Sequence, residues 1–463
     1  MIHYISTRGK APRLSFKDVV LAGLASDGGL YVPDSIPTFA PHELVAMQSL
    51  SYTELALKVM QPFIGDAIPE KKLRSLIKDT YKNFRHPAIA PLKQLGPNEF
   101  LLELFHGPTL AFKDFALQFL GRVIEYFIAQ KKEQLTVIGA TSGDTGSAAI
   151  EGCKGRKNMR IFILHPKDRV SDVQRKQMTS INDKNVFNLA IKGAFDDCQN
   201  IVKALFADEA FRTKQKLTAV NSINWARILA QVIYYFYASL ALGAPAKRVS
   251  FSVPTGNFGD IYAGYIAKQM GLPIDKLIIA TNSNDILART LKTGTYGIGK
   301  VSTTLSPSMD IQISSNFERL LFDLYGHDGH TIADMMQRFG KTKKIVLSQE
   351  ALTKLRHDFA AGSADNAATL ATIKAVYKES GELLDPHTAV GMHVGRQHHK
   401  NKTSALITLA TAHPAKFSDA VKKATSVHPT LPQHLGGLMK LKERMHVLAN
   451  DVKAIKTFIE KHS

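Results

Sequence analysis

Short runs of apolar residues alternate with helical patterns through most of the chain after residue 100. The runs are almost continuously apolar, as expected for strands that are buried on both faces of a sheet. Alternation of strands and helices is typical of parallel sheets covered by helices on both sides, so we expect an α/β fold. The predicted strands are residues 136–140, 160–164, 186–191, 249–253, 276–280 and 405–409, and the clearest helices between them are residues 170–180, 196–207 and 225–242.

The first part of the chain has helical spacing instead, near residues 16–24, 52–60 and 70–83. We therefore predict a small, mainly helical N-terminal domain over residues 1–92. Residues 93–133 together with 237–463 are predicted to form a larger α/β domain, and residues 134–236 a smaller one. Residues 285–400 show helices but few strands, at residues 317–325, 351–360 and 367–378, and an amphipathic helix is predicted over residues 440–461.

Composition narrows the class of protein. A chain of 463 residues is too long for one small core, and its 44% hydrophobic and 21% charged residues are typical of a globular protein. Cys153 and Cys198 are the two cysteines and form no Cys-x-x-Cys motif, which favours a reducing compartment. The N-terminus has no secretory pattern, so we expect a cytoplasmic protein. The longest apolar run, residues 228–242, falls short of the ~20 residues of a membrane span and is predicted to be a buried helix.

The chain carries a formal net charge of +19, which raises the question of nucleic-acid binding. Its basic residues are scattered and accompany no nucleic-acid-binding motif, so we expect a solvated basic surface and no nucleic-acid partner. Attraction of a phosphorylated substrate is a second explanation of the charge. The paired histidines His398 and His399 lack the spacing of metal ligands, and we predict no metal site.

A candidate nucleophile lies at the head of an apolar helical pattern, where Lys113 stands between Phe112 and Asp114 after a Gly107-Pro108 turn signal. Burial among aromatic side chains disfavours an ammonium group and lowers its pKa, leaving a nucleophilic amine that suits Schiff-base chemistry with an aldehyde cofactor. Taken alone, Lys113 fits an ordinary surface lysine paired with Asp114 better than a catalytic one.

Three further segments each place small or polar residues at the start of a predicted helix. Residues 141–146 and 254–260 follow predicted strands, and residues 221–227 begin the helix that contains Arg227. Free backbone N–H groups at a helix N-terminus form an anion site. None of the segments has the P-loop or dinucleotide-binding pattern, and each also fits an ordinary turn or helix cap.

Residues 106–114, His-Gly-Pro-Thr-Leu-Ala-Phe-Lys-Asp, resemble the pyridoxal phosphate (PLP) lysine motif of the threonine synthase family. Residues 4–9 and 27–33 resemble the opening of the same family. The resemblance implies two mostly parallel αβα domains with PLP in the cleft between them, next to the small N-terminal domain. It implies that Lys113 holds PLP and carries the catalytic proton transfers.

The resemblance also implies roles for the other segments. The PLP phosphate would be held by Gly256, Asn257, Phe258 and Gly259, and the pyridine nitrogen by the hydroxyl of Thr411. Ser142 and Thr145 would bind the substrate α-carboxylate, and Asn221, Ser222 and Arg227 its phosphate. Asp144 stands where many relatives have an asparagine that contacts the cofactor's phenolic oxygen; a carboxylate donates a hydrogen bond only when protonated.

The family's reaction converts O-phospho-L-homoserine and water to L-threonine and phosphate, and we expect it here, in a monomer or homodimer. One alternative is a related phospho-lyase that releases 2-oxobutyrate, and another is a serine or threonine dehydratase. The intact motif around Lys113, together with Arg227, argues against the dehydratase. A basic protein associated with nucleic acid, with purely structural loops, is the alternative outside enzymes.

Overall fold

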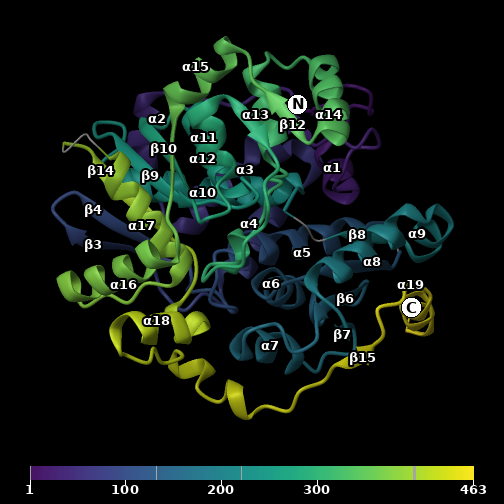
Figure 1. Cartoon of the computed structure of the whole chain (residues 1–463). Coiled ribbons are helices and arrows are strands. Elements are labelled where there is room, and N and C mark those ends of the chain that lie inside the picture. The colour runs from purple at the N-terminus through teal and green to yellow at the C-terminus, as the bar shows by residue number, and fades with distance from the viewer. Residues whose placement is uncertain (1, 132, 220–221, 400–402, 463) are drawn as a thin grey trace.

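The computed structural model of the chain describes residues 2–131, 133–219, 222–399 and 403–462. Its larger sheet has six strands in the order β13-β10-β9-β14-β4-β3 (Figure 1). Neighbouring strands run parallel except β3, which is antiparallel to β4. The strands are β3 (Leu92–Gly96), β4 (Glu99–Glu103), β9 (Val249–Pro254), β10 (Ile274–Thr281), β13 (Phe359–Ser363) and β14 (Ala405–Ala410).

Helices cover both faces of the larger sheet because successive side chains of each strand point to opposite faces. On β10, Leu277 and Ile279 join the core that contains the first group of helices, whereas Ile278 and Ala280 pack with α17. The first group is α5 (Lys113–Lys131), α10 (Trp225–Ala241) and α11 (Gly259–Gln269), and the other face carries α17 (Pro386–His398), with α16 (Asn366–Ser380) and α18 (Ser418–Thr425) beside it.

The smaller sheet has five parallel strands in the order β15-β7-β6-β5-β8. Val137 and Ile161 face the core shared with α6, whereas Ile138 and Phe162 face a second core formed with α8, α9 and α19. The elements are β5 (Leu135–Ala140), β6 (Met159–Pro166), β7 (Val186–Ile191), β8 (Leu217–Ala219), β15 (His446–Leu448), α6 (Asp144–Cys153), α7 (Asp172–Thr179), α8 (Phe195–Ala207), α9 (Glu209–Gln215) and α19 (Val452–Lys461).

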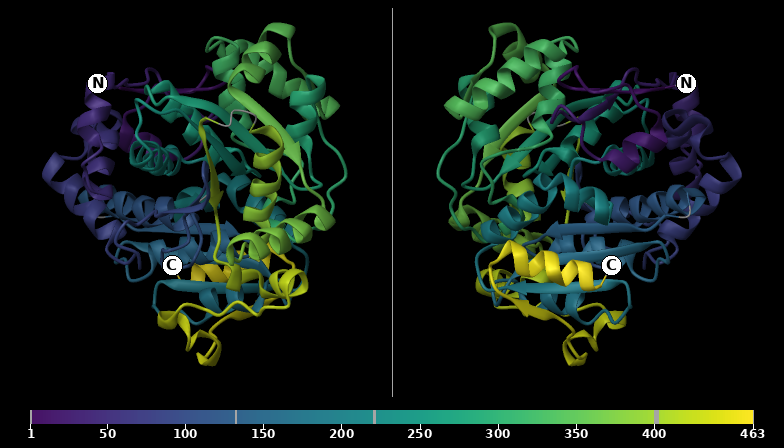
Figure 2. Two further views of the ribbon diagram at one scale, coloured as in Figure 1. Left: turned by 90° about the vertical axis from the view of Figure 1, so that its left-hand side faces the viewer. Right: turned by 90° about the vertical axis from the view of Figure 1, so that its right-hand side faces the viewer.

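The N-terminal segment shares its core with the rest of the molecule. The Tyr4 ring lies 5.9 Å from that of Trp225, at the start of α10. Figure 2 shows the N-terminal helices along one flank. The elements are β1 (Tyr4–Ser6), antiparallel to β2 (Tyr31–Pro33), and α1 (Phe16–Ala22), α2 (Pro41–Met47), α3 (Tyr52–Ile64) and α4 (Glu70–Tyr81).

Helix α5 connects the larger sheet with the smaller sheet because it packs on α10 on one side and on α6 on the other. The contact with α6 is close enough to require glycine: a Cβ on Gly121 would lie 2.3 Å from the carbonyl oxygen of Gly152. A Cβ on Gly152 would in turn lie 2.5 Å from the carbonyl oxygen of Leu117. Lys113, the first residue of α5, is thereby fixed relative to both sheets.

The predicted strands are confirmed to within two residues, and most predicted helices lie where expected. The exception is residues 440–461, predicted as one helix. There the chain forms β15, paired with β7, and α19 begins only at Val452, where the Asp451 carboxylate accepts the N–H of Ala454 at 2.7 Å. The predicted domain division placed these residues with the larger domain, but they lie on the smaller sheet (Figure 1).

Residues 285–363 contain more elements than their pattern predicts. The helix predicted over 351–360 ends at Asp358, and the chain continues as β13 because the segment pairs with β10. This region forms α12 (Ile286–Thr293), β11 (Thr295–Gly297), α13 (Phe317–Leu324), α14 (Gly329–Thr342), β12 (Lys344–Val346) and α15 (Gln349–Asp358).

The apolar run after Trp225 is α10, whose side chains are almost all buried in the core. Within the described residues, no helix has both the length and the apolar character needed to cross a membrane.

Candidate active site

The segment before α5 is joined to the segment after β14. Ala111 forms an antiparallel bridge with Ala412, and the N–H of Phe112 donates to the carbonyl of Thr411 at 2.9 Å. This pairing brings Lys113 and Thr411, nearly 300 residues apart, to neighbouring positions on one cavity wall.

Lys113 is buried, with 7% of its surface exposed. Its Nζ donates to the Ser308 hydroxyl at 3.4 Å and lies 3.7 Å from Asp144 Oδ2. Burial lowers the pKa of Lys113 to about 8; the Asp144 charge opposes this shift, and Arg227 and Lys416 add to it. An amine with this pKa is partly neutral near neutral pH, as a Schiff-base nucleophile needs to be.

The surface-lysine interpretation of Lys113 is therefore wrong. Asp114, its expected partner, instead accepts the N–H of Thr109 at 2.8 Å and the Thr109 hydroxyl at 2.7 Å. Burial raises the pKa of Asp114 to about 7. A Cβ on Gly107 would lie 2.5 Å from Asp114 Oδ2, so glycine at this position lets the carboxylate close the loop.

Residues 254–260 turn from β9 into α11, as the sequence predicts. Gly256 lies against the chain at Ser308, where a Cβ would be 2.9 Å from the carbonyl oxygen. Phe258 takes a left-handed conformation with φ 64°. The first N–H groups of α11 have no acceptor within their helix and lie at the cavity, which suits a phosphate group.

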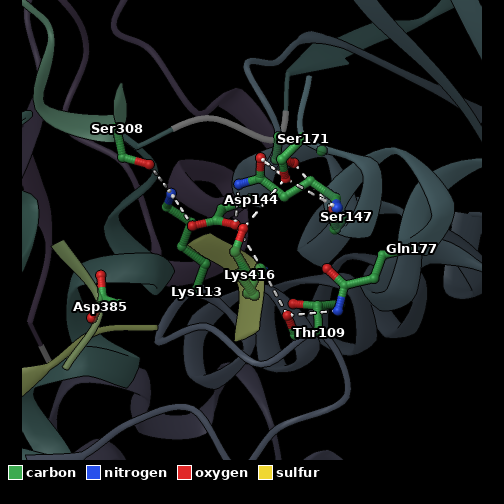
Figure 3. Close-up of polar contacts among 12 residues, drawn as sticks. Thr109, Lys113, Asp144, Ser147, Ser171, Gln177, Ser308, Asp385 and Lys416 are labelled. Carbon is green, nitrogen blue, oxygen red and sulfur yellow. Dashed lines mark hydrogen bonds and ion pairs between the residues drawn. The ribbon is translucent and has the colours of Figure 1, made fainter. Parts of the chain in front are cut away.

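The loop after β5 places Ser142 and Thr145 on the cavity wall. The Thr141 hydroxyl holds the loop by accepting the N–H of Gly143 at 3.0 Å and of Gly146 at 2.8 Å. Asp144 does not line the cavity, and its Oδ1 lies 2.7 Å from Lys416 Nζ (Figure 3). Gln174 Nε2 donates to the same oxygen at 2.7 Å.

Arg227 is 5% exposed in the first turn of α10, and burial lowers its pKa to about 10. Asn224 caps this helix, accepting the N–H of Ala226 at 3.0 Å. In the described part of the chain, Arg227 Nη1, Gln231 Oε1 and Asp260 Oδ2 are buried without a hydrogen-bond partner, and all three residues line the cavity. Unpaired buried polar atoms around one cavity indicate a polar ligand there.

The predicted site residues meet in one cavity of about 1970 Å³. Its wall includes Lys113, Ser142, Thr145, Ser222, Arg227, Gly256, Asn257, Phe258, Gly259 and Thr411. Asp144 lies behind Lys113, and Asn221 lies outside the described residues. Three of the wall segments follow the carboxyl ends of β5, β9 and β14, where parallel α/β sheets bind ligands.

Several residues of the site carried no recognised signal in the sequence. Asp385 caps α17 and its Oδ1 pairs with His387 Nδ1 at 2.8 Å; His387 Nε2 in turn accepts the N–H of Ser308 at 3.2 Å. The Thr388 hydroxyl donates to Asp385 and accepts the N–H of Thr411 at 3.2 Å. The Asp-Pro start of this helix is a cap signal that could have been noticed, whereas nothing marked Ser308.

These groups fit PLP. Lys113 offers an amine for its aldehyde, the start of α11 offers free N–H groups for its phosphate, and Thr411 lines the same cavity.

Comparison with known proteins agrees with this geometry. Residues 3–81 match the family described as threonine synthase N terminus, residues 84–357 the pyridoxal-phosphate dependent enzyme family, and residues 388–459 the threonine synthase C-terminal family. Threonine synthase of Pseudomonas aeruginosa is 52% identical over 100% of this chain and 98% of its own length.

Solved structures give the same result. The PLP-bound threonine synthase of Brucella melitensis superposes with a TM-score of 0.98 at 53% identity, covering 100% of both chains. Yeast threonine synthase superposes with a TM-score of 0.94 at 44% identity, over 99% of this chain and 98% of the other. The chain therefore belongs to the threonine synthase family of pyridoxal-phosphate-dependent enzymes.

Proposed function

We propose that the chain converts O-phospho-L-homoserine and water to L-threonine and phosphate. The observation that carries the proposal is the meeting, in one cavity, of a buried amine with a pKa near 8, a phosphate-type loop at α11 and the buried guanidinium of Arg227. Bound PLP supplies an electron sink for the carbanion that forms when a substrate proton is removed. The protein's own residues bind and orient the substrate and the cofactor, and they move protons.

Two groups of anion-binding residues on one cavity support a phosphorylated amino acid as substrate. The start of α11 is assigned to the PLP phosphate through Gly256, Asn257, Phe258 and Gly259. Arg227 and Ser222 are assigned to the substrate's phosphate. Asn221 is assigned to it as well, by resemblance alone. A guanidinium binds such a group through charge-assisted hydrogen bonds, and burial strengthens them. Ser142 and Thr145, which line the cavity at the start of α6, are assigned to the α-carboxylate by resemblance to the family.

Lys113 is the proposed catalytic base and acid. Its amine lies at the cavity wall with a lowered pKa, so it can take the Cα proton in neutral form and return it later. Ser308, 3.4 Å from the Lys113 nitrogen, orients the amine. Thr411 would contact the ring nitrogen with a hydroxyl, which does not force that nitrogen to remain protonated as a carboxylate would.

Product analysis tests the proposal. Purified protein loaded with PLP is incubated with O-phospho-L-homoserine, and threonine, phosphate and 2-oxobutyrate are measured. Equal amounts of threonine and phosphate are expected, with no turnover by Lys113→Ala. Phosphate accompanied by 2-oxobutyrate in place of threonine would identify a phospho-lyase and refute the proposal.

We also infer that the protein works in the cytoplasm as a monomer or homodimer, without nucleic acid. Cys153 and Cys198 are both buried free thiols, in keeping with a reducing compartment. Burial raises the pKa of the Cys153 thiol to about 12, so it is unreactive at neutral pH.

A further inference from the structure

Behind Lys113 lies a second buried lysine. Lys416 belongs to the short 3-10 turn Pro414–Phe417 after β14 and is 1% exposed. Its Nζ donates to the carbonyl of Thr109 at 2.6 Å and lies 2.7 Å from Asp144 Oδ1 (Figure 3). A buried ammonium group is costly unless it is paired and hydrogen-bonded, and these two contacts meet both conditions.

The two lysines stand at different distances from one carboxylate. Asp144 Oδ1 is 2.7 Å from Lys416, whereas Asp144 Oδ2 is 3.7 Å from Lys113. Gln174 Nε2 donates to Oδ1 as well, and the Gln174 side chain is held by the Ser171 hydroxyl, which donates to its Oε1 at 2.9 Å. The carboxylate is therefore turned toward Lys416, and Lys113 has only its more distant oxygen.

We propose that Lys416 is a positioning residue that serves as the counter-ion of Asp144, so that Asp144 does not hold Lys113 as its ammonium partner. The inference rests on the proposed function in that Lys113 must act as an amine. Without Lys416, Asp144 would be a buried anion whose nearest cation is Lys113, and Coulomb attraction would stabilise the charged lysine.

The electrostatics of the cluster agree with this arrangement. Burial alone would raise the pKa of Asp144, but Lys416 and then Lys113 hold it below its usual range. Lys113 is faced by Asp144 from α6, Arg227 from α10 and Lys416, while His387 lines the same cavity. Lys416 also faces Asp114 and His413, whose pKa values are raised and lowered respectively, both mainly by burial.

The cluster also ties the active-site lysine to two loops. Thr109 accepts from Lys416 through its carbonyl, and the same carbonyl accepts Gln177 Nε2 from α7 at 3.0 Å. Lys416 thus connects the turn after β14, the loop before α5 and the N-terminus of α6. Arginine keeps the charge at this position, whereas methionine keeps the approximate length and removes it.

The test is a pH titration of the visible absorbance of the PLP-loaded protein, which reports protonation of the nitrogen that Lys113 supplies. Lys416→Met is expected to raise the midpoint by about one unit or more, because an opposite charge left unshared within ~4–6 Å favours the protonated form. Asp144→Asn is expected to lower it, and the double variant to fall between the two. Lys416→Arg should stay close to the wild type.

Lys268→Met is the matched control. Lys268 pairs with Asp358 at 2.8 Å, with 18% and 19% of the side chains exposed, and neither residue lines the cavity. The titration midpoint of Lys268→Met should equal that of the wild type. A Lys416→Met midpoint equal to this control, or shifts of the same sign for Lys416→Met and Asp144→Asn, would overturn the proposal.

Turnover gives an independent readout. Lys416→Met is expected to lower kcat by about tenfold or more near neutral pH, with recovery as pH rises, because the ammonium form of the base is inactive. If Lys416→Met does not fold, Asp144→Asn decides: an unchanged midpoint there refutes the role of the pair. A wild-type protein that does not turn over O-phospho-L-homoserine would instead refute the proposed function, whereas the titration would still test the role of Lys416.

Discussion

Replacing Arg227 by methionine separates substrate binding from stability. Arg227 is 5% exposed and its Nη1 has no hydrogen-bond partner among the described residues. If it binds the substrate's phosphate, one charge-assisted contact contributes about 2–3 kcal/mol, and its loss lowers kcat/KM by about 30- to 200-fold. Because Arg227 Nη1 is a buried donor without a partner among the described residues, and burial opposes the charge, removal of the side chain should leave the melting temperature unchanged or raise it.

Arg319→Met is the matched control, since Arg319 is also buried and burial lowers its pKa to about 10 as well. Arg319, however, donates to the carbonyls of Tyr31 at 3.0 Å and Ile223 at 2.5 Å. Loss of the two hydrogen bonds that Arg319 donates to these carbonyls costs about 2–6 kcal/mol, so the melting temperature of Arg319→Met should fall clearly.

The assays are steady-state kinetics with O-phospho-L-homoserine and thermal unfolding with and without inorganic phosphate. Phosphate should raise the melting temperature of the wild type and have little effect on Arg227→Met. The reasoning is refuted if Arg227→Met loses as much stability as Arg319→Met while kcat/KM stays at the wild-type value.

Three further predictions concern the cofactor and its surroundings. Cofactor-free protein should capture PLP faster as pH rises through about 8, because only the neutral Lys113 amine is nucleophilic; the growth of visible absorbance after mixing measures the rate, and a rate independent of pH there contradicts the lowered pKa. Asp385→Asn should lower kcat by about tenfold with a smaller change in KM, since it loosens the contacts of His387 with Ser308 and of Thr388 with Thr411; an unchanged kcat would leave these contacts purely structural. Gly256→Ala should weaken PLP retention by about tenfold, because its Cβ would lie 2.9 Å from the carbonyl oxygen of Ser308; equilibrium dialysis measures the loss, and wild-type retention would show that the loop does not hold the phosphate.

The parallel sheets could be predicted because strands buried on both faces are continuously apolar, as in β6 and β9. Elements fixed by distant partners could not. Strand β15 is three residues long and exists through its pairing with β7, and β13 exists through β10. Helix α17 was missed because it is buried almost all round, which removes the polar face that marks a helix in a sequence.

The same distinction holds for the site. Lys113, the loop before α11 and Arg227 lie in local patterns that resemble a family, so they could be named in advance. Lys416, Asp385 and Ser308 act through contacts that arise only when β14, α17 and the start of α5 come together, as in the bridge between Ala111 and Ala412. No local pattern encodes which of two lysines a carboxylate will face.

Reduction of the PLP-loaded protein with borohydride tests the central claim most directly, because it makes the bond between the cofactor and its lysine permanent. Peptide mass spectrometry should then find the cofactor on Lys113 alone, with complete loss of threonine formation. Attachment to Lys416 or to another lysine, or no attachment in an active preparation, would contradict the site described for this chain.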